Sequence, residues 1–321
     1  MIVKSVPVAL VLVAICLVSP VAFGQPPSEV APDVGTIDPG DEQPAEEEGG
    51  IQDNSFFIEE AYNQEPGVVQ HIFNWVRQWD DDDGRERTFD FVFTEEMPIG
   101  SQDHQFSFAI PFSSIYEQGI GEPPFNADGL GDIMLNYRYQ LLGGEDATWW
   151  SAPRFSVILD TAHGDEGLGN GTTGYQFNLP ISREFENIAF HFNAGCTIFP
   201  NAEVGQTDGS ISPPTNLMGY NLGASLIDIR NKKVQPMLEV VLNWDDEVDG
   251  LGARSHEFEA LISPGFRWAP YTQGSTQWVL GAAVPVGLTR DSPDVGVFLY
   301  MSFEHAVPRR CCRACACDGN Y

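Results

Sequence analysis

Long hydrophobic runs are missing from nearly the whole chain. Beyond the first 24 residues, no apolar stretch approaches the roughly 18 residues that a transmembrane helix needs. Positive charge is also scarce, with 16 lysine and arginine residues against 46 aspartate and glutamate residues and a net charge of -30. Because such a surface repels phosphates, we expect no nucleic-acid partner. These two shortages exclude a bundle of membrane-spanning helices and a nucleic-acid-binding protein.

Signatures of common enzyme chemistry are missing as well. The sequence has no G-x-S-x-G motif, no H-E-x-x-H motif and no glycine-rich phosphate loop followed by a lysine. Its six histidines are scattered singly along the chain. We therefore expect no enzymatic activity, no catalytic residue and no cofactor.

Cysteine is rare and concentrated in a tail over residues 308–321. The spacing of Cys312, Cys315 and Cys317 suits a soft metal, but no distant Cys or His pair completes a zinc site. Disulfides within the tail are the alternative in an exported protein. The acidic run Asp80, Asp81, Asp82 and Asp83 predicts a solvated loop, with a weak divalent-cation site as its alternative.

The first 50 residues have the features of an export signal and a linker. Lys4 precedes an apolar run that ends near Val18, and Ala22 and Gly24 are small residues at the two positions that signal peptidase reads. We predict a signal peptide over residues 1–24. Residues 25–50 are acidic and rich in proline without an apolar period, which predicts a disordered linker.

The remaining chain, residues 68–307, is dominated by strict alternation of apolar and polar side chains. In residues 129–144, for example, Leu135, Tyr137 and Tyr139 are separated by polar or charged residues. We count about twelve such strands, within a range of about 10 to 14, each of about nine to fourteen residues. An even number of strands of this length predicts an all-β fold, an antiparallel up-and-down transmembrane β-barrel.

The connections between the predicted strands are sorted by length. The odd-numbered connections span about 5 to 17 residues and the even-numbered ones about 4 to 7, as expected for long outer loops and short periplasmic turns. Prolines inside predicted strands argue against a closed barrel, and we interpret some of them as bulges or boundary errors. These prolines are Pro111, Pro153, Pro180, Pro236, Pro264 and Pro285.

The second face of the predicted strands is polar and charged. Ionisable side chains that line a membrane-embedded cavity commonly set ion or solute selectivity. Alternatively, they pair across a narrow lumen and merely fill it. The candidate lumen-lining residues are Asp132, Arg138, Arg154, His191, Glu239, Glu257, Glu259 and Arg267.

Two segments carry a resemblance to a known family. The run E-E-A-Y-N-Q-E-P-G-V-V-Q-H within residues 55–72 and the strand start G-L-G-D at residues 129–132 resemble outer-membrane transporters labelled as the meta-pathway of phenol degradation. The resemblance implies a transmembrane barrel that passes small aromatic or other apolar compounds. It carries over no substrate residue, and the cysteine-rich tail departs from it.

Residues 51–67, which precede the first predicted strand, form a segment of their own. Apolar residues among glutamates predict a short amphipathic helix that ends at Pro66 and Gly67. Such a segment folds back to plug the periplasmic mouth, or it is a simple lead-in to the first strand.

We therefore predict a protein embedded in the lipid bilayer of the outer membrane of a Gram-negative-type bacterium. Our leading hypothesis is that it passes or binds a small solute, with aromatic or apolar compounds as candidates. A structural or adhesive barrel with cation-binding acidic loops is the second hypothesis. A soluble exported β-sandwich binding protein is the third.

Overall fold

The computed structural model describes residues 50–307, except residues 52, 82–83, 121–122, 145–146, 163–166 and 207–208. The predicted signal peptide, the linker up to residue 49, Asp82, Asp83 and the cysteine-rich tail lie outside the described residues. The described part is all-β. None of its segments forms a helix that is long and apolar enough to cross a membrane.

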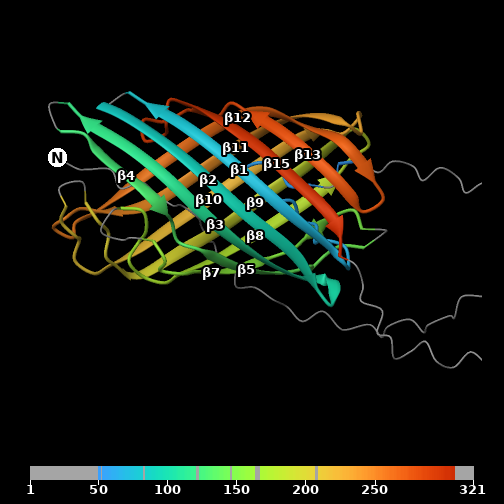
Figure 1. The fold of residues 1–321 in the computed structure, drawn as a ribbon, viewed down its shortest axis with the longest axis horizontal. Helices are drawn as coiled ribbons and strands as arrows, with labels where there is room; N and C mark the ends of the chain where they lie inside the picture. Colours follow the sequence, from blue (N-terminus) through green and yellow to red (C-terminus); the bar gives the residue numbers. More distant parts are fainter. Residues whose placement is uncertain are drawn as a thin grey trace, which may run out of the picture.

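A single antiparallel sheet closes on itself as a barrel of twelve strands, which confirms the predicted fold (Figure 1). Its elements are β1 Val68–Asp80, β2 Gly84–Ile99, β3 Ser101–Gly119, β4 Phe125–Leu130, β5 Met134–Tyr139, β6 Trp150–Ser151, β7 Arg154–Ile158, β8 Gly174–Glu184, β9 Ile188–Ala202, β10 Thr215–Asp228, β11 Val234–Val248, β12 Arg254–Gln273, β13 Thr276–Ala283, β14 Val286–Gly287 and β15 Val295–Ala306. The barrel closes where β1 pairs with β15, from Val68 opposite Ala306 to Trp79 opposite Val295. Three barrel strands are each divided in two, as β4 with β5, β6 with β7 and β13 with β14.

The two faces of the barrel wall differ in the way that the alternation predicts. Outward side chains such as Tyr137 and Phe155 are large and apolar and keep 42% and 48% of their surface exposed. Inward side chains such as Gln105 and Gln176 are polar and buried. An apolar outside and a polar inside are typical of a barrel whose outer wall meets lipid. The third hypothesis, a soluble β-sandwich, is therefore wrong, because a sandwich packs apolar side chains between two separate sheets.

Some strands are longer than the sequence pattern predicts. β3 has 19 residues and β12 has 20, because backbone pairing continues past the apolar zone into residues that are polar on both faces. The connections shrink accordingly, and the first is reduced to residues 81–83. The longest connections, residues 159–173 and 203–214, are both odd-numbered, as expected. The even-numbered connection 140–149 is longer than predicted.

The strand predicted over residues 129–144 is broken at residues 131–133, between β4 and β5. Prolines account for the other two divided strands, since Pro153 lies between β6 and β7 and Pro285 between β13 and β14. Each removes a backbone donor from the ladder. The remaining four prolines of the prediction stay within strands and pair in register, namely Pro111, Pro180, Pro236 and Pro264.

Candidate functional site in the barrel lumen

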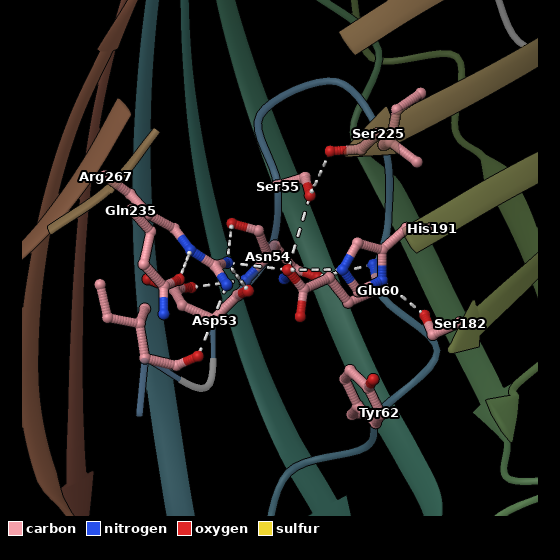
Figure 2. A network of polar contacts seen from close by, with 12 residues as sticks. Asp53, Asn54, Ser55, Glu60, Tyr62, Ser182, His191, Ser225, Gln235 and Arg267 are labelled. Carbon is pink, nitrogen blue, oxygen red and sulfur yellow. Dashed lines mark hydrogen bonds and ion pairs between the residues drawn. The ribbon is translucent and has the colours of Figure 1, made fainter. Parts of the chain in front are cut away.

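The lumen contains a stretch of the chain itself, residues 50, 51 and 53–67, which we call the inner segment. It forms no helix, in contrast to the expected amphipathic helix. Hydrogen bonds join it to inward side chains of β1, β3, β5, β8, β9, β11, β12 and β15. Because these strands surround the barrel axis, the segment lies across the lumen and not against one wall (Figure 2).

Glu239, on β11, holds the middle of the inner segment by its backbone. Its Oε1 atom accepts hydrogen bonds from three successive backbone N–H groups, those of Phe56 at 3.1 Å, Phe57 at 3.0 Å and Ile58 at 3.2 Å. Successive N–H groups that converge in this way form a concave site for an anion. The carboxylate is completely buried. A strand side chain therefore satisfies three backbone donors that have no other partner in secondary structure.

Other inward side chains form hydrogen bonds with the backbone of the inner segment just after Ile58. The Asn193 amide accepts from the N–H of Glu59 and donates to its carbonyl, both at 2.8 Å. Arg138 donates to the carbonyl of Glu60 at 2.6 Å and also to that of Tyr62. Side chains of the lumen wall thus bind backbone groups of the inner segment, and these hydrogen bonds hold an irregular segment in one conformation.

Two ion pairs add charge complementarity between the wall and the inner segment. Arg267, on β12, donates from Nη1 to Glu60 Oε1 at 2.7 Å and from Nε to Gln235 at 2.8 Å (Figure 2). Arg154, on β7, donates from Nε to both carboxylate oxygens of Glu59, at 2.9 and 3.1 Å. Burial opposes the ionisation of Glu59, but the charge and hydrogen bonds of Arg154, together with the charge of Arg138, outweigh it and lower the pKa of this carboxyl. The guanidinium groups of Arg154 and Arg267 are therefore each matched by a carboxylate of the inner segment.

Asp53 anchors the beginning of the inner segment to β1 and β15. Its carboxylate accepts hydrogen bonds from Gln70, Tyr300 and Ser302. Burial raises the pKa of Asp53 from 3.8 to about 6, although these hydrogen bonds and the charge of Arg267 oppose the shift. Asp53 therefore titrates in a pH range in which an exposed aspartate is fully ionised.

Apolar side chains of the inner segment fill recesses above glycines of the wall. The Phe56 ring stacks on Phe298 with centroids 5.0 Å apart and lies 5.4 Å from Tyr300. A Cβ atom on Gly281 would lie 2.4 Å from the Phe56 ring. A Cβ on Gly223 would likewise lie 2.1 Å from Ile58 Cδ1. Only glycine leaves room at these inward positions, so the strands are shaped to seat the segment.

Ser182, His191 and Glu60 form a chain that resembles the order of a catalytic triad. Ser182 Oγ lies 2.7 Å from His191 Nδ1, and His191 Nε2 lies 3.5 Å from Glu60 Oε1 (Figure 2). However, Ser182 and His191 are completely buried, and Ser182 Oγ accepts a hydrogen bond from the N–H of Ala61 at 2.8 Å. Because the inner segment covers the hydroxyl, the three residues hold the segment in this conformation and offer a substrate no access.

The candidate lumen residues fall into two groups. Five of them contact the inner segment, namely Arg138, Arg154, His191, Glu239 and Arg267. Asp132 instead accepts hydrogen bonds from Thr161 and Ala162, both at 3.0 Å, and anchors the connection 159–173. Glu257 and Glu259 lie further along β12, opposite Asp245 and Asn243.

Sequence reasoning missed the uncharged members of this site. The charge pattern singles out only ionisable residues. It does not identify the amide of Asn193 or the hydroxyl of Ser182. It also does not identify the glycines against which Phe56 and Ile58 pack, namely Gly223, Gly265 and Gly281. A signal was available, since glycines on the inward face of a strand commonly mark a close approach by another part of the chain.

Of the acidic run at the first hairpin, the structure describes Asp80 and Asp81. Asp81 pairs with Arg87 at 2.8 Å, and its N–H donates to Asp294 at 3.1 Å. Among the residues with described positions, no three His, Cys, Asp or Glu side chains are grouped so as to hold a metal ion. The weak cation site over Asp80 to Asp83 stays a prediction, because Asp82 and Asp83 lie outside the described residues.

Comparisons with known proteins identify the fold. No family model and no curated protein matches the sequence. An outer-membrane channel from Pseudomonas putida F1 matches in structure with a TM-score of 0.57 and 11% identity, over 77% of this chain and 98% of that chain. This likeness shows the fold alone, that of an outer-membrane channel, and confirms the sequence resemblance at that level.

Two further solved structures match less closely. The β domain of the Bordetella autotransporter BrkA has a TM-score of 0.47 and 10% identity, over 76% of this chain and 100% of that chain. The NanC porin has a TM-score of 0.42 and 9% identity, over 74% of this chain and 100% of that chain.

Proposed function

We propose that this protein is an outer-membrane channel for a small solute and that its inner segment closes the lumen. The apolar outer wall and the barrel fold support a location in the outer membrane of a Gram-negative-type bacterium. The observation that carries the proposal is the position of the inner segment, which is bonded to strands on opposite sides of the barrel. The wall side chains that bind the inner segment fit it specifically, and this supports a channel whose opening is regulated by release of the segment.

The dimensions of the barrel support the same conclusion. Twelve strands give a lumen between the side-chain-filled barrels of about eight strands and the open porins of about 16. A polypeptide that crosses such a lumen occupies much of its cross-section. We therefore propose that solute passes only when the inner segment moves from its seat.

We further propose that the solute has an aromatic or apolar body. The recess that holds the Phe56 ring supports this choice, because its walls, Phe298 and Tyr300, are aromatic and buried inside the barrel. The family resemblance of residues 55–72 implies the same class of solute. The lipid bilayer and this solute are then the partners of the protein.

A reversible crosslink tests whether the inner segment closes the channel. Ser55 Oγ, in the segment, lies 3.2 Å from Ser225 Oγ, on β10, so cysteines at both positions are close enough for a disulfide. We propose to record conductance of the Ser55→Cys/Ser225→Cys protein in planar bilayers under oxidising and reducing conditions. The two single substitutions, Ser55→Cys and Ser225→Cys, are matched controls that keep the native cysteines, and heat-modifiable migration reports that each variant is folded.

The expected result is conductance in the reduced double variant and its loss on oxidation, with no redox effect in either single variant. Equal conductance in both states, with the crosslink verified by mass spectrometry, would mean that solute passes beside the inner segment. Absence of conductance from the folded, inserted wild-type protein and from the reduced variant would overturn the channel itself.

A further inference from the structure

We propose that the wall now covered by Phe56 and Glu60 binds a small carboxylate with a planar apolar body, such as an arylcarboxylate. The inference rests on the proposed function, because it names the chemical class of the solute. In the closed protein, the phenyl ring of Phe56 and the carboxylate of Glu60 occupy the two halves of this site. The inner segment thus acts as an intramolecular substitute for the solute.

The first half of the site is a recess for one flat ring. Phe298 stacks on the Phe56 ring with an interplanar angle of 18°, and Tyr300 closes the side at 5.4 Å. The floor is made by Gly265 and Gly281, whose added Cβ atoms would lie 3.1 and 2.4 Å from Phe56 ring atoms. Gly265 on β12 and Gly281 on β13 lie on neighbouring strands. Because neither has a side chain, they leave space for one flat ring, and this space is too small for a bulkier group.

The second half is the guanidinium of Arg267. In the pairing of β12 with β13, Arg267 lies directly opposite Gly281, and it follows Gly265 by two positions on the same face of β12. Residues two positions apart in a strand are separated by about 7 Å. A carboxylate joined to the ring directly or through one carbon covers this separation once its hydrogen bond to the guanidinium is included.

The charge of Arg267 selects the sign of the solute. Its side chain keeps only 2% of its surface exposed, and its ionic partner is Glu60 of the inner segment. A buried guanidinium that loses its carboxylate is strongly destabilised. When Glu60 leaves, a solute carboxylate restores the pair, whereas a neutral ring leaves Arg267 unpaired and a cationic ring repels it.

Binding measurements on full-length protein in detergent test this assignment. We would titrate wild type, Glu60→Gln and Arg267→Gln with benzoate, phenol and benzylamine and follow binding by calorimetry. Glu60→Gln removes the internal competitor, so we expect it to bind benzoate more tightly than wild type does and at least about tenfold more tightly than phenol or benzylamine. Arg267→Gln removes the charged partner and should weaken benzoate binding by about tenfold or more.

The proposal expects the two substitutions to change the affinity for benzoate in opposite directions. Simple loosening of the structure would change the affinity of both variants in the same direction. In Glu60→Gln alone, the Phe56 side chain can still fill the ring recess. A Phe56→Ala/Glu60→Gln variant empties both halves of the site and gives a second measurement for that case. No benzoate binding by this folded variant would overturn the proposal. Equal binding of benzoate and phenol would also overturn it and would indicate a neutral aromatic solute.

These outcomes are independent of the conductance experiment. Benzoate binding without conductance would refute the channel and leave the carboxylate site intact. Conductance that is controlled by the crosslink, together with no preference for benzoate, would refute the carboxylate site and leave the channel intact.

Discussion

Replacing Glu239 by leucine should release the inner segment from the lumen wall. Glu239 Oε1 accepts three backbone hydrogen bonds, from Phe56, Phe57 and Ile58, and the Glu239 side chain is 0% exposed. A buried N–H group without an acceptor costs at least about 1 kcal/mol, so three cost about 3 kcal/mol. Since about 1.4 kcal/mol corresponds to a factor of ten, the docking equilibrium should shift by about 100-fold.

Hydrogen exchange followed by mass spectrometry measures this shift directly. In Glu239→Leu, amides of the inner segment should exchange about 100-fold faster, while amides of the barrel strands keep their wild-type protection. Glu239→Gln is the matched control, because it keeps an oxygen acceptor at the same position, and its effect should stay below about tenfold. Unchanged exchange of residues 56–58 in a folded Glu239→Leu barrel would refute the assigned role of this carboxylate.

Two further predictions concern the docking of the inner segment. Because the pKa of Asp53 is raised from 3.8 to about 6, the docked segment binds this proton more tightly than the released segment does. Docking should therefore be strongest below pH of about 4 and weaken as the pH rises to about 6. Asp53→Asn should reduce this dependence of docking on pH, measured as hydrogen exchange of the inner segment. Gly223→Val should also loosen the segment, by about tenfold or more in hydrogen exchange, because a Cβ there lies 2.1 Å from Ile58 Cδ1. Adding Ile58→Ala should relieve the clash, and failure of this rescue would contradict the steric explanation.

The architecture was predictable from the sequence because its signal is local and repeated. Alternation such as that around Leu135, Tyr137 and Tyr139 assigns each residue to one face, and an apolar face of this extent needs lipid or a core. Strand ends were less predictable. β12 continues to 20 residues because backbone pairing does not require alternation beyond the apolar zone.

The candidate site was predictable only in part. Alternation placed Arg138, Arg154 and Arg267 on the inner face, and they are buried there. Their partners were not predictable, because a polar inner face fits both an open, water-lined lumen and one filled by the chain. Glu59 and Glu60 could not be assigned to these arginines from sequence, since nothing local marks the contact.

The sequence by itself determined the barrel, the orientation of its faces and the identity of the charged inward residues. Only the tertiary structure decided that these residues hold the inner segment. Arg267 and Glu60 are 207 positions apart along the chain. They meet because the sheet closes and the inner segment lies inside it, and a contact that depends on closure of the whole barrel leaves no periodic trace in the sequence.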